Sequence, residues 1–230
     1  MFANFDFDVI RRSLGYLFLD GMTFTLTLTG LAALGGLIFG TLIALMRLSG
    51  FKLLGQIAGG YVDLMRSLPL VLVIFWFYFL VPYIGQWVTG ASRPMHVGAF
   101  ASSLVTFILF EAAYFSEIMR AGIQSISRGQ QAAAQALGLT YSQTMRYVVL
   151  PQAFRNMLPV LLTQTIVLFQ DTSLVYVLSI PDFLGAASKV AERDGRLVEM
   201  YLFAAAVYFT ISCSASFGVR RLQARIAVLR

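Results

Sequence analysis

Two carboxylates, Glu111 and Asp171, stand inside apolar segments that are long enough to cross a membrane. Ionisable groups at bilayer depth are costly and usually functional. Amide and hydroxyl side chains share the segment of Asp171, namely Gln164, Thr165, Gln170, Thr172 and Ser173. Amides and hydroxyls donate hydrogen bonds and a carboxylate accepts them, so we expect this polar face to point to a cavity or to another chain rather than to lipid. A structural role for Asp171 is equally open, since an Asp-Thr-Ser run favours local backbone hydrogen bonds at a helix break.

The elements that must hold these side chains are transmembrane helices. The chain has 230 residues, of which 58% are hydrophobic and 12% are charged. Apolar runs of about 20 residues recur, which is the length that crosses a hydrocarbon core as a helix. We therefore predict an all-α integral membrane protein with a single domain over residues 1–230. Its five spans are expected at Gly21–Met46, Leu68–Trp87, Val97–Met119, Leu158–Ile180 and Met200–Val219.

The distribution of basic residues predicts the orientation, because Lys and Arg collect on the cytoplasmic side. With the N-terminus outside, the inner segments hold 11 Lys and Arg residues, Arg66 and Arg230 among them, and the outer segments hold six. This count predicts N-out, C-in. At ~1.5 Å per helical residue, Asp171 then lies ~20 Å and Glu111 ~12 Å from the inner ends of their spans, so we expect no paired-carboxylate site.

Two residue pairs have helical spacing. Gly36 and Gly40 form a G-x-x-x-G pair, which permits close approach of a helix from a partner or from the same chain. Glu117 and Arg120 stand at i and i+3, which predicts an ion pair.

The third loop, at about residues 122–157, is polar and rich in alanine. Ser127 with Gln130, and Thr140 with Gln143, each have the spacing of a capping box. A capping box marks a helix N-terminus, so each pair predicts a helix that begins directly after it.

Gly138 separates these two expected helices and predicts a left-handed stop after the first. The second should end before Pro151. The exposed side of the first consists of the alanines Ala132, Ala133, Ala134 and Ala136. Since so short a helix is not stable alone, we expect it to pack either on its own membrane domain or in a groove of another chain.

Several function classes lack the residues they need. Cys213 and His96 are the single cysteine and histidine, so neither an intrachain disulfide nor a Cys/His metal set can form. The ATP-binding pattern G-x-x-x-x-G-K-[ST] and the catalytic patterns H-E-x-x-H and G-x-S-x-G do not occur. The net charge of +6 is explained by cytoplasmic loops rather than by a nucleic-acid site. We expect a non-catalytic membrane protein with no metal and no cofactor of its own.

The run from Gly129 to Gly138, followed by Leu150-Pro151, resembles the EAA loop, E-A-A-x3-G-x9-I-x-L-P, of bacterial ABC importer permeases. Ala132 stands where the family has Glu, so any polar contact of that Glu is absent or replaced. The resemblance implies a cytoplasmic coupling helix that docks in a groove of an ATPase subunit. The coupling residues it implies are Gly129, Ala132, Ala133, Ala134, Leu137, Gly138, Leu150 and Pro151.

Other segments resemble the polar-amino-acid subfamily of these permeases, namely residues 66–70 (RSLPL), 113–123 and 170–174 (QDTSL). Residues 111–114, 169–178 and 192–195 are most similar to glutamate/aspartate permeases. The resemblance implies a type I importer (MetI-like) fold in the bacterial inner membrane and translocation of glutamate or aspartate. An acidic substrate beside an ionised Asp171 would need a compensating Arg or Lys, which we expect from a partner chain.

The partners that the resemblance implies include an ABC ATPase dimer, which would bind the ATP and Mg. A second permease chain, identical or a paralogue, a periplasmic amino-acid-binding protein and membrane lipid complete the set, and no nucleic acid is expected. The alternative is an ion-coupled secondary transporter with Glu111 and Asp171 as coupling groups. In that case the third loop would lack a purpose.

Overall fold

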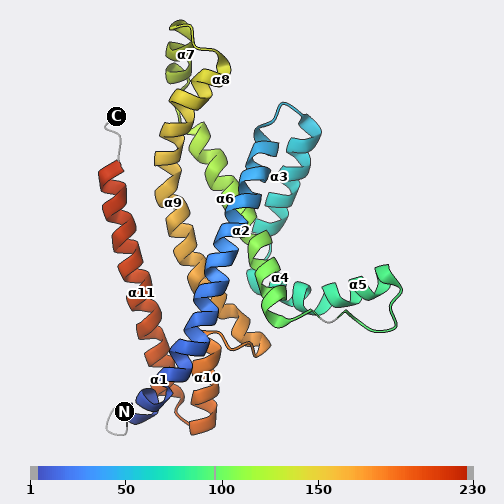
Figure 1. Cartoon of the computed structure of the whole chain (residues 1–230), viewed down its shortest axis with the longest axis vertical. Helices are drawn as coiled ribbons and strands as arrows, with labels where there is room; N and C mark the ends of the chain where they lie inside the picture. Colours follow the sequence, from blue (N-terminus) through green and yellow to red (C-terminus); the bar gives the residue numbers. More distant parts are fainter. Residues whose placement is uncertain (1–4, 96, 227–230) are drawn as a thin grey trace. The chain divides into compact units, whose positions relative to one another are not determined.

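The computed structural model describes residues 5–95 and 97–226, and every regular element in these ranges is a helix (Figure 1). His96 and Arg230, which entered the residue counts above, lie outside the described residues. Five helical stretches are long and apolar enough to cross a membrane, namely Phe7–Leu48, Leu70–Thr89, Ala99–Gln124, Tyr141–Leu178 and Leu197–Ile226. The predicted all-α architecture with five spans is confirmed, and each stretch overlaps its predicted span.

The chain forms two compact units, and each is assembled from three segments. Unit 1 contains Met1–Leu34, Leu68–Ile108 and Ile166–Ala215, and unit 2 contains Gly35–Ser67, Leu109–Thr165 and Ser216–Arg230. The long helices therefore contribute to both units. These helices are α2 (Thr23–Leu48), α6 (Ala99–Gln124), α9 (Leu150–Asp171) and α11 (Leu197–Ile226).

In unit 1 the amphipathic helix α1 (Phe7–Gly15) continues into a π-helical segment, η1 (Tyr16–Met22), which packs on the short helix α10 (Phe183–Asp194). Gly21 permits this contact, because a Cβ at that position would lie 2.9 Å from the Cβ of Ala186. The buried apolar cluster around α10 includes Leu17, Met22, Phe169, Phe183, Val190 and Met200. α10 is therefore a packed part of unit 1 rather than a surface loop.

Asp182 begins α10 as its N-cap. Its carboxylate accepts from the backbone N–H groups of Leu184 at 3.0 Å and Gly185 at 2.9 Å. The residue is 0% exposed. Burial raises the pKa of Asp182 to about 6, although the two N–H groups act in the opposite direction. The cap also requires glycine at Gly185, where a Cβ would lie 2.3 Å from the carbonyl oxygen of Ile180.

The fourth span changes its helical form at Asp171. α9 ends there and continues as a 3-10 helix, η4 (Thr172–Leu178). Ser179 follows with a φ of 59°, in the left-handed region. Because a residue with a Cβ enters that region at a cost of about 1–2 kcal/mol, the end of this span is locally strained.

In unit 2 the second half of α2 packs on α6 through glycine. A Cβ at Gly36 would lie 2.8 Å from the Cβ of Glu111, and one at Gly40 would lie 2.9 Å from the Cβ of Phe115. The G-x-x-x-G pair therefore serves packing within the chain, which was one of the two alternatives. A cluster of Ala44, Phe115, Met119 and Leu161 continues this contact.

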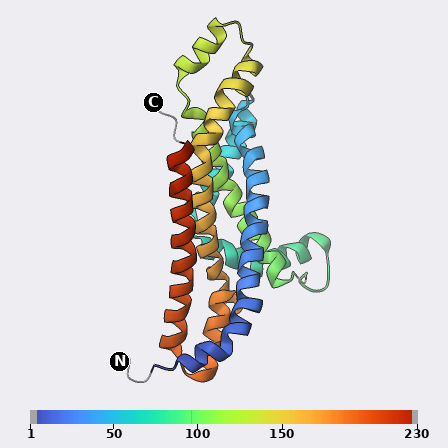
Figure 2. The ribbon, with the colours of Figure 1, turned by 60° about the vertical axis from the view of Figure 1, so that its left-hand side comes forward.

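Helix α3 (Lys52–Ser67) was not expected, and it runs back along the second half of α2 (Figures 1 and 2). The Tyr61 hydroxyl donates to the carbonyl of Leu109, and the Arg66 guanidinium lies over the ring of Tyr114. Leu109 and Tyr114 belong to α6, inside the third candidate span. Arg66 therefore lies in a helix rather than in a loop. With or without Arg66, the charge count leaves the larger number inside, and N-out, C-in stays the prediction.

A π-helical turn, η3 (Met145–Val149), leads directly into α9. The residue before Pro151 donates its N–H to the carbonyl of Met145, five residues back. In a regular α-helix the proline ring would clash with the carbonyl four residues back, and the wider turn relieves this clash. The prediction that the second loop helix ends before Pro151 is therefore wrong, because it continues into the fourth span. The same arrangement precedes Pro82, at η2 (Trp76–Leu80).

Candidate functional site

The loop between α6 and α9 folds as a helix, a glycine corner and a second helix (Figure 1). α7 (Arg128–Ala136) ends at Gly138, whose φ is 85°. The N–H of Gly138 donates to Gln135 at 2.9 Å, and the N–H of Leu139 donates to Ala134 at 3.2 Å. These two bonds form a Schellman motif, so the predicted left-handed stop is confirmed.

The two predicted capping boxes have different outcomes. At the start of α8 (Tyr141–Thr144), the N–H of Gln143 donates to the Thr140 hydroxyl at 3.3 Å, and the N–H of Thr140 donates to the Gln143 side chain at 2.9 Å. This box is confirmed. The prediction of a capping box at Ser127 is wrong, because the Ser127 side chain makes no capping hydrogen bond. The first turn of α7 closes instead through the Ser127 carbonyl, which accepts from Gln130 at 3.1 Å.

Most of the expected coupling residues are exposed. Leu137 is 84% exposed, and the other exposed members are Gly129, Ala132, Ala133, Gly138, Leu150 and Pro151. Ala134 is only 4% exposed, so its placement on the exposed side was wrong. It lies on the inner face of α7, the helix that contacts α8 and η3. Sequence patterns did not indicate two exposed neighbours, Tyr141 and Tyr147.

An apolar cluster anchors the loop to the spans within unit 2. Its buried members are Ile126, Val149 and Ala153, with Ile123 and Met145 packed against them. Ile123 belongs to the end of α6, Ile126 to the turn that follows it, and the others to the π-helical turn and the start of α9. A force applied to the loop therefore reaches both helices.

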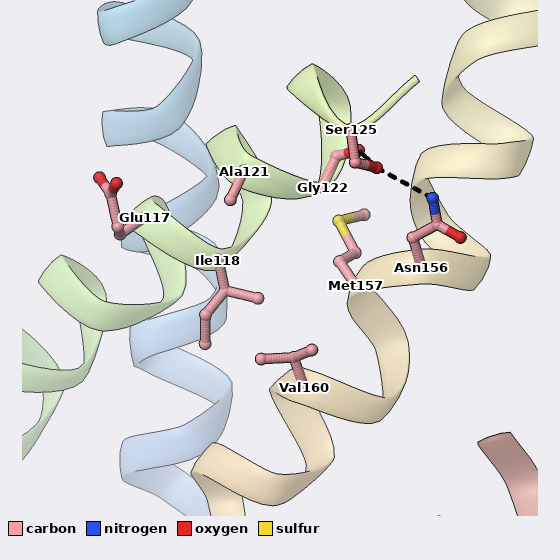
Figure 3. Close-up of a pocket in the computed structure, with 8 residues that line it drawn as sticks. All are labelled: Glu117, Ile118, Ala121, Gly122, Ser125, Asn156, Met157 and Val160. Carbon is pink, nitrogen blue, oxygen red and sulfur yellow. Dashed lines mark hydrogen bonds between the residues drawn. The ribbon is translucent and has the colours of Figure 1, made fainter. Parts of the chain in front are cut away.

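Next to this cluster, α6 and α9 enclose a groove of about 320 Å³ (Figure 3). Its lining is mostly apolar and comprises Glu117, Ile118, Ala121, Gly122, Ser125, Asn156, Met157 and Val160. Asn156 Nδ2 donates to Ser125 Oγ at 2.9 Å. A Cβ at Gly122 would lie 2.8 Å from the Cβ of Met157. These two contacts join α6 to α9 directly beside the loop.

Glu111 is 0% exposed and lies within unit 2. Gln164 Nε2 donates to its Oε1 at 3.3 Å, so two of the expected pathway residues are in contact. The hydroxyl of Thr165 donates to the carbonyl of Leu161 at 3.0 Å, one turn earlier in α9. In this conformation Glu111 therefore links α6 to α9 and presents no surface to a ligand.

The remaining expected pathway residues, Gln170 to Ser173, belong to unit 1. Gln170 is exposed, and Asp171 and Ser173 are partly exposed. Thr172 is buried, and its hydroxyl donates to the carbonyl of Phe169 at 2.7 Å. Asp171 stands at the change to the 3-10 helix, as the structural alternative expected, but its side chain makes no capping bond.

The predicted ion pair of Glu117 with Arg120 is present, and a second arginine joins it. Arg47 of α2 also contacts the Glu117 carboxylate. The i, i+3 spacing predicted the first pair, whereas the second joins residues 70 positions apart. Such a contact has no local sequence signal.

Within residues 5–95 and 97–226, no group of three His, Cys, Asp or Glu side chains could hold a metal ion.

Comparisons with known proteins agree with this arrangement. The model of the family described as binding-protein-dependent transport system inner membrane component matches residues 36–228. The glutamate/aspartate import permease protein GltK of Escherichia coli O6:H1 is 56% identical over 224 residues, covering 97% of this chain and 99% of GltK. The probable glutamine ABC transporter permease protein GlnM of Bacillus subtilis is 32% identical, covering 91% and 93%.

Two solved structures share the fold. The crystal structure of an amino acid ABC transporter with histidines matches with a TM-score of 0.86 and 33% identity, covering 96% of this chain and 98% of that chain. The inward-facing MetNI methionine ABC transporter matches with a TM-score of 0.73 and 17% identity, covering 93% and 97%, which concerns the fold alone. The expected ABC importer permease fold is confirmed.

Proposed function

The chain belongs to the family of inner-membrane components of binding-protein-dependent transport systems, and we propose that it is the permease subunit of an ATP-driven importer of glutamate and aspartate. The protein is a multi-pass protein of the inner membrane. The 56% identity with GltK along nearly the whole of both chains supports this substrate over glutamine, since GlnM is only 32% identical.

The observation that carries the proposal is the anchored loop. α7 presents Ala132 and Ala133 to the outside, and these small side chains let a partner approach the backbone closely. We assign this face to a groove of a separate ATPase dimer, which binds ATP and Mg. The chain itself is then a non-catalytic subunit without a cofactor.

Coupling follows from the continuity of the helices. Closure of the ATPase dimer displaces α7, and the Schellman corner at Gly138 passes the displacement to α8. α8 continues through the π-helical turn into α9, while the cluster around Val149 engages α6. Packed helices move as rigid bodies, so the loop shifts two spans together.

The substrate path is assigned to Gln170, Asp171 and Ser173, whose side chains are at least partly exposed. Thr172 keeps its hydroxyl on the carbonyl of Phe169 within the same unit. The other partners are a second permease chain, identical or a paralogue, and a periplasmic binding protein that delivers the amino acid.

Co-purification tests the proposal. The chain, co-expressed with its ATPase and solubilised in mild detergent, should retain ATPase activity that rises when a glutamate-loaded binding protein is added. Ala133→Asp should abolish association with the ATPase, because it places an unpaired charge in a packed interface, whereas the matched Ala133→Ser should not. A chain that purifies alone and carries glutamate into liposomes under an ion gradient would establish the secondary-transporter alternative instead.

A further inference from the structure

The C-terminal end of α3 places a positive charge beside the third candidate span. Arg66 is 14 residues after the start of α3 at Lys52, which is about 21 Å of helix at 1.5 Å per residue. Its guanidinium carbon lies 5.5 Å from the ring centroid of Tyr114. Tyr114 lies five residues before Met119, the predicted inner end of the third span, or about 8 Å along α6. Since a hydrocarbon core is about 30 Å thick, the contact with Tyr114 places this guanidinium inside it.

The guanidinium of Arg66 lies over the Tyr114 ring and forms no ion pair with a described carboxylate, including Asp63 one turn before it. Arg47 and Arg120 both pair with Glu117, so their charges are compensated in part. Among the residues that the structure describes, no carboxylate lies within ion-pair distance of Arg66, which is exposed. An arginine at this depth that faced lipid would be costly, and such residues usually face a partner group or a water-filled pathway.

Other polar groups lie on the same side of α3. Asp63 and Ser67 stand one turn apart, both are exposed, and helical spacing places them on the face of Arg66. The Ser67 hydroxyl donates to the Asp63 carbonyl at 2.6 Å, so the Asp63 carboxylate stays available. α3 ends at Ser67 and the next helix begins only at Leu70, which leaves a break in the helix at membrane depth. Secondary transporters bind substrates at helix breaks, where backbone groups lack helical partners, and this break offers the same chemistry.

On the basis of the function proposed above, we propose that Arg66 binds a carboxylate of the translocated amino acid. A guanidinium matches a carboxylate with two parallel hydrogen bonds. Tyr114 is a positioning residue that holds the guanidinium over its ring, and Asp63 offers an acceptor for the ammonium group. Arg66 thereby offers, from within unit 2, a positive charge to an acidic substrate.

Uptake by the complete complex in proteoliposomes tests this assignment. With glutamate delivered by its binding protein, Arg66→Gln should lower the uptake rate at least about tenfold, and Arg66→Lys should retain part of it. The control is Lys52→Gln, at the opposite end of α3, which should leave uptake and basal ATPase activity unchanged. Uptake by Arg66→Gln at the wild-type rate would overturn the assignment, and the arginine would then only complement the helix dipole.

Uptake of glutamine, measured in the same proteoliposomes, shows which carboxylate of the substrate Arg66 binds. If Arg66 binds the side-chain carboxylate, Arg66→Gln should shift the preference from glutamate toward glutamine. If it binds the α-carboxylate, the variant should lose uptake of both amino acids to the same extent. A wild-type complex that does not take up glutamate would refute the proposed function together with this inference, whereas normal wild-type uptake with an unaffected Arg66→Gln refutes the inference alone.

A second variant leaves Arg66 in place and covers the case in which Arg66→Gln does not assemble. Ser67→Cys, in a Cys213→Ser background, should react with a cationic water-soluble thiol reagent, and glutamate with its binding protein should slow the reaction. A thiol that does not react, or one that reacts at the same rate with and without glutamate, would show that the face of Arg66 is not part of the pathway.

Discussion

Replacing Asp182 with asparagine should remove the pH dependence of the free energy of unfolding that the buried Asp182 carboxyl causes. The pKa of this N-cap carboxyl is raised to about 6 from an ordinary value of 3.8. The folded state therefore binds the proton more tightly than the unfolded state does. Between these two pKa values the free energy of unfolding falls as the pH rises, because the folded protein must keep a buried charge.

The size of this effect follows from the two pKa values. They differ by about 2 pH units, and one unit corresponds to about 1.36 kcal/mol, so the ionised group lowers stability by about 3 kcal/mol at pH 7. Asparagine keeps one acceptor for the Gly185 N–H and gives up the bond to Leu184, which costs about 1 kcal/mol. The net gain at pH 7 is then about 2 kcal/mol, which corresponds to an increase in Tm of roughly 4–8 °C for a chain of this size.

Thermal unfolding in detergent, recorded at pH 4, 5, 6 and 7, measures this difference. The wild-type Tm should fall relative to that of Asp182→Asn across this range, and the two should differ most at pH 7. Asp194→Asn, at the other end of α10, is the matched control. Arg193 and Arg12 lower the pKa of Asp194, so its contribution is present at neutral pH and is lost as the pH falls. Parallel wild-type and Asp182→Asn curves from pH 4 to 7 would refute the reasoning.

Three further predictions follow from the packing of the helices and from the helix ends. Gly40→Ala should destabilise the protein by about 1–3 kcal/mol, because the added methyl group overpacks against α6. Gly30→Ala has open space around it and should stabilise α2 by up to about 1 kcal/mol. Thermal unfolding of both variants measures these changes. Thr140→Ala should cost about 1 kcal/mol and Ser127→Ala much less, as measured by hydrogen exchange of α8 and α7. Gly138→Ala should cost about 1–2 kcal/mol at its positive φ and lower the binding-protein-stimulated ATPase rate of the assembled complex, without preventing assembly.

The sequence predicted the spans because hydropathy over about 20 residues is a strong signal. It did not predict α3, in which Lys52, Asp63 and Arg66 interrupt the apolar pattern. This helix lies against α2 and α6 and buries only one side, so it needs no continuous apolar run. Its sequence therefore had the composition of a loop, and the contact of Arg66 with Tyr114 has no local sequence signal.

The loop shows which details local patterns decide. The left-handed stop at Gly138 follows from one residue type, and it was predicted. The Ser127 box failed because its hydroxyl can rotate away, and two residues with correct spacing do not fix that rotation. Ala134 was misplaced because four alanines in one short helix give no contrast between its faces. Contacts such as Arg47 with Glu117 join distant parts of the chain, which no spacing rule reaches.

Because of the π-helical turn before Pro151, the length of the loop determines how α7 is rotated relative to α9. Each residue added to or removed from a helix rotates everything beyond it by about 100° around the axis. The proline fixes the wide turn, and so fixes how many residues separate Gly138 from the span. A deletion of one residue between them would leave the composition of the loop nearly intact but would turn the face of α7 away from its direction relative to α9. The number of residues between Gly138 and the span therefore determines the direction in which α7 faces relative to α9. For this direction, the number of residues matters more than their identities.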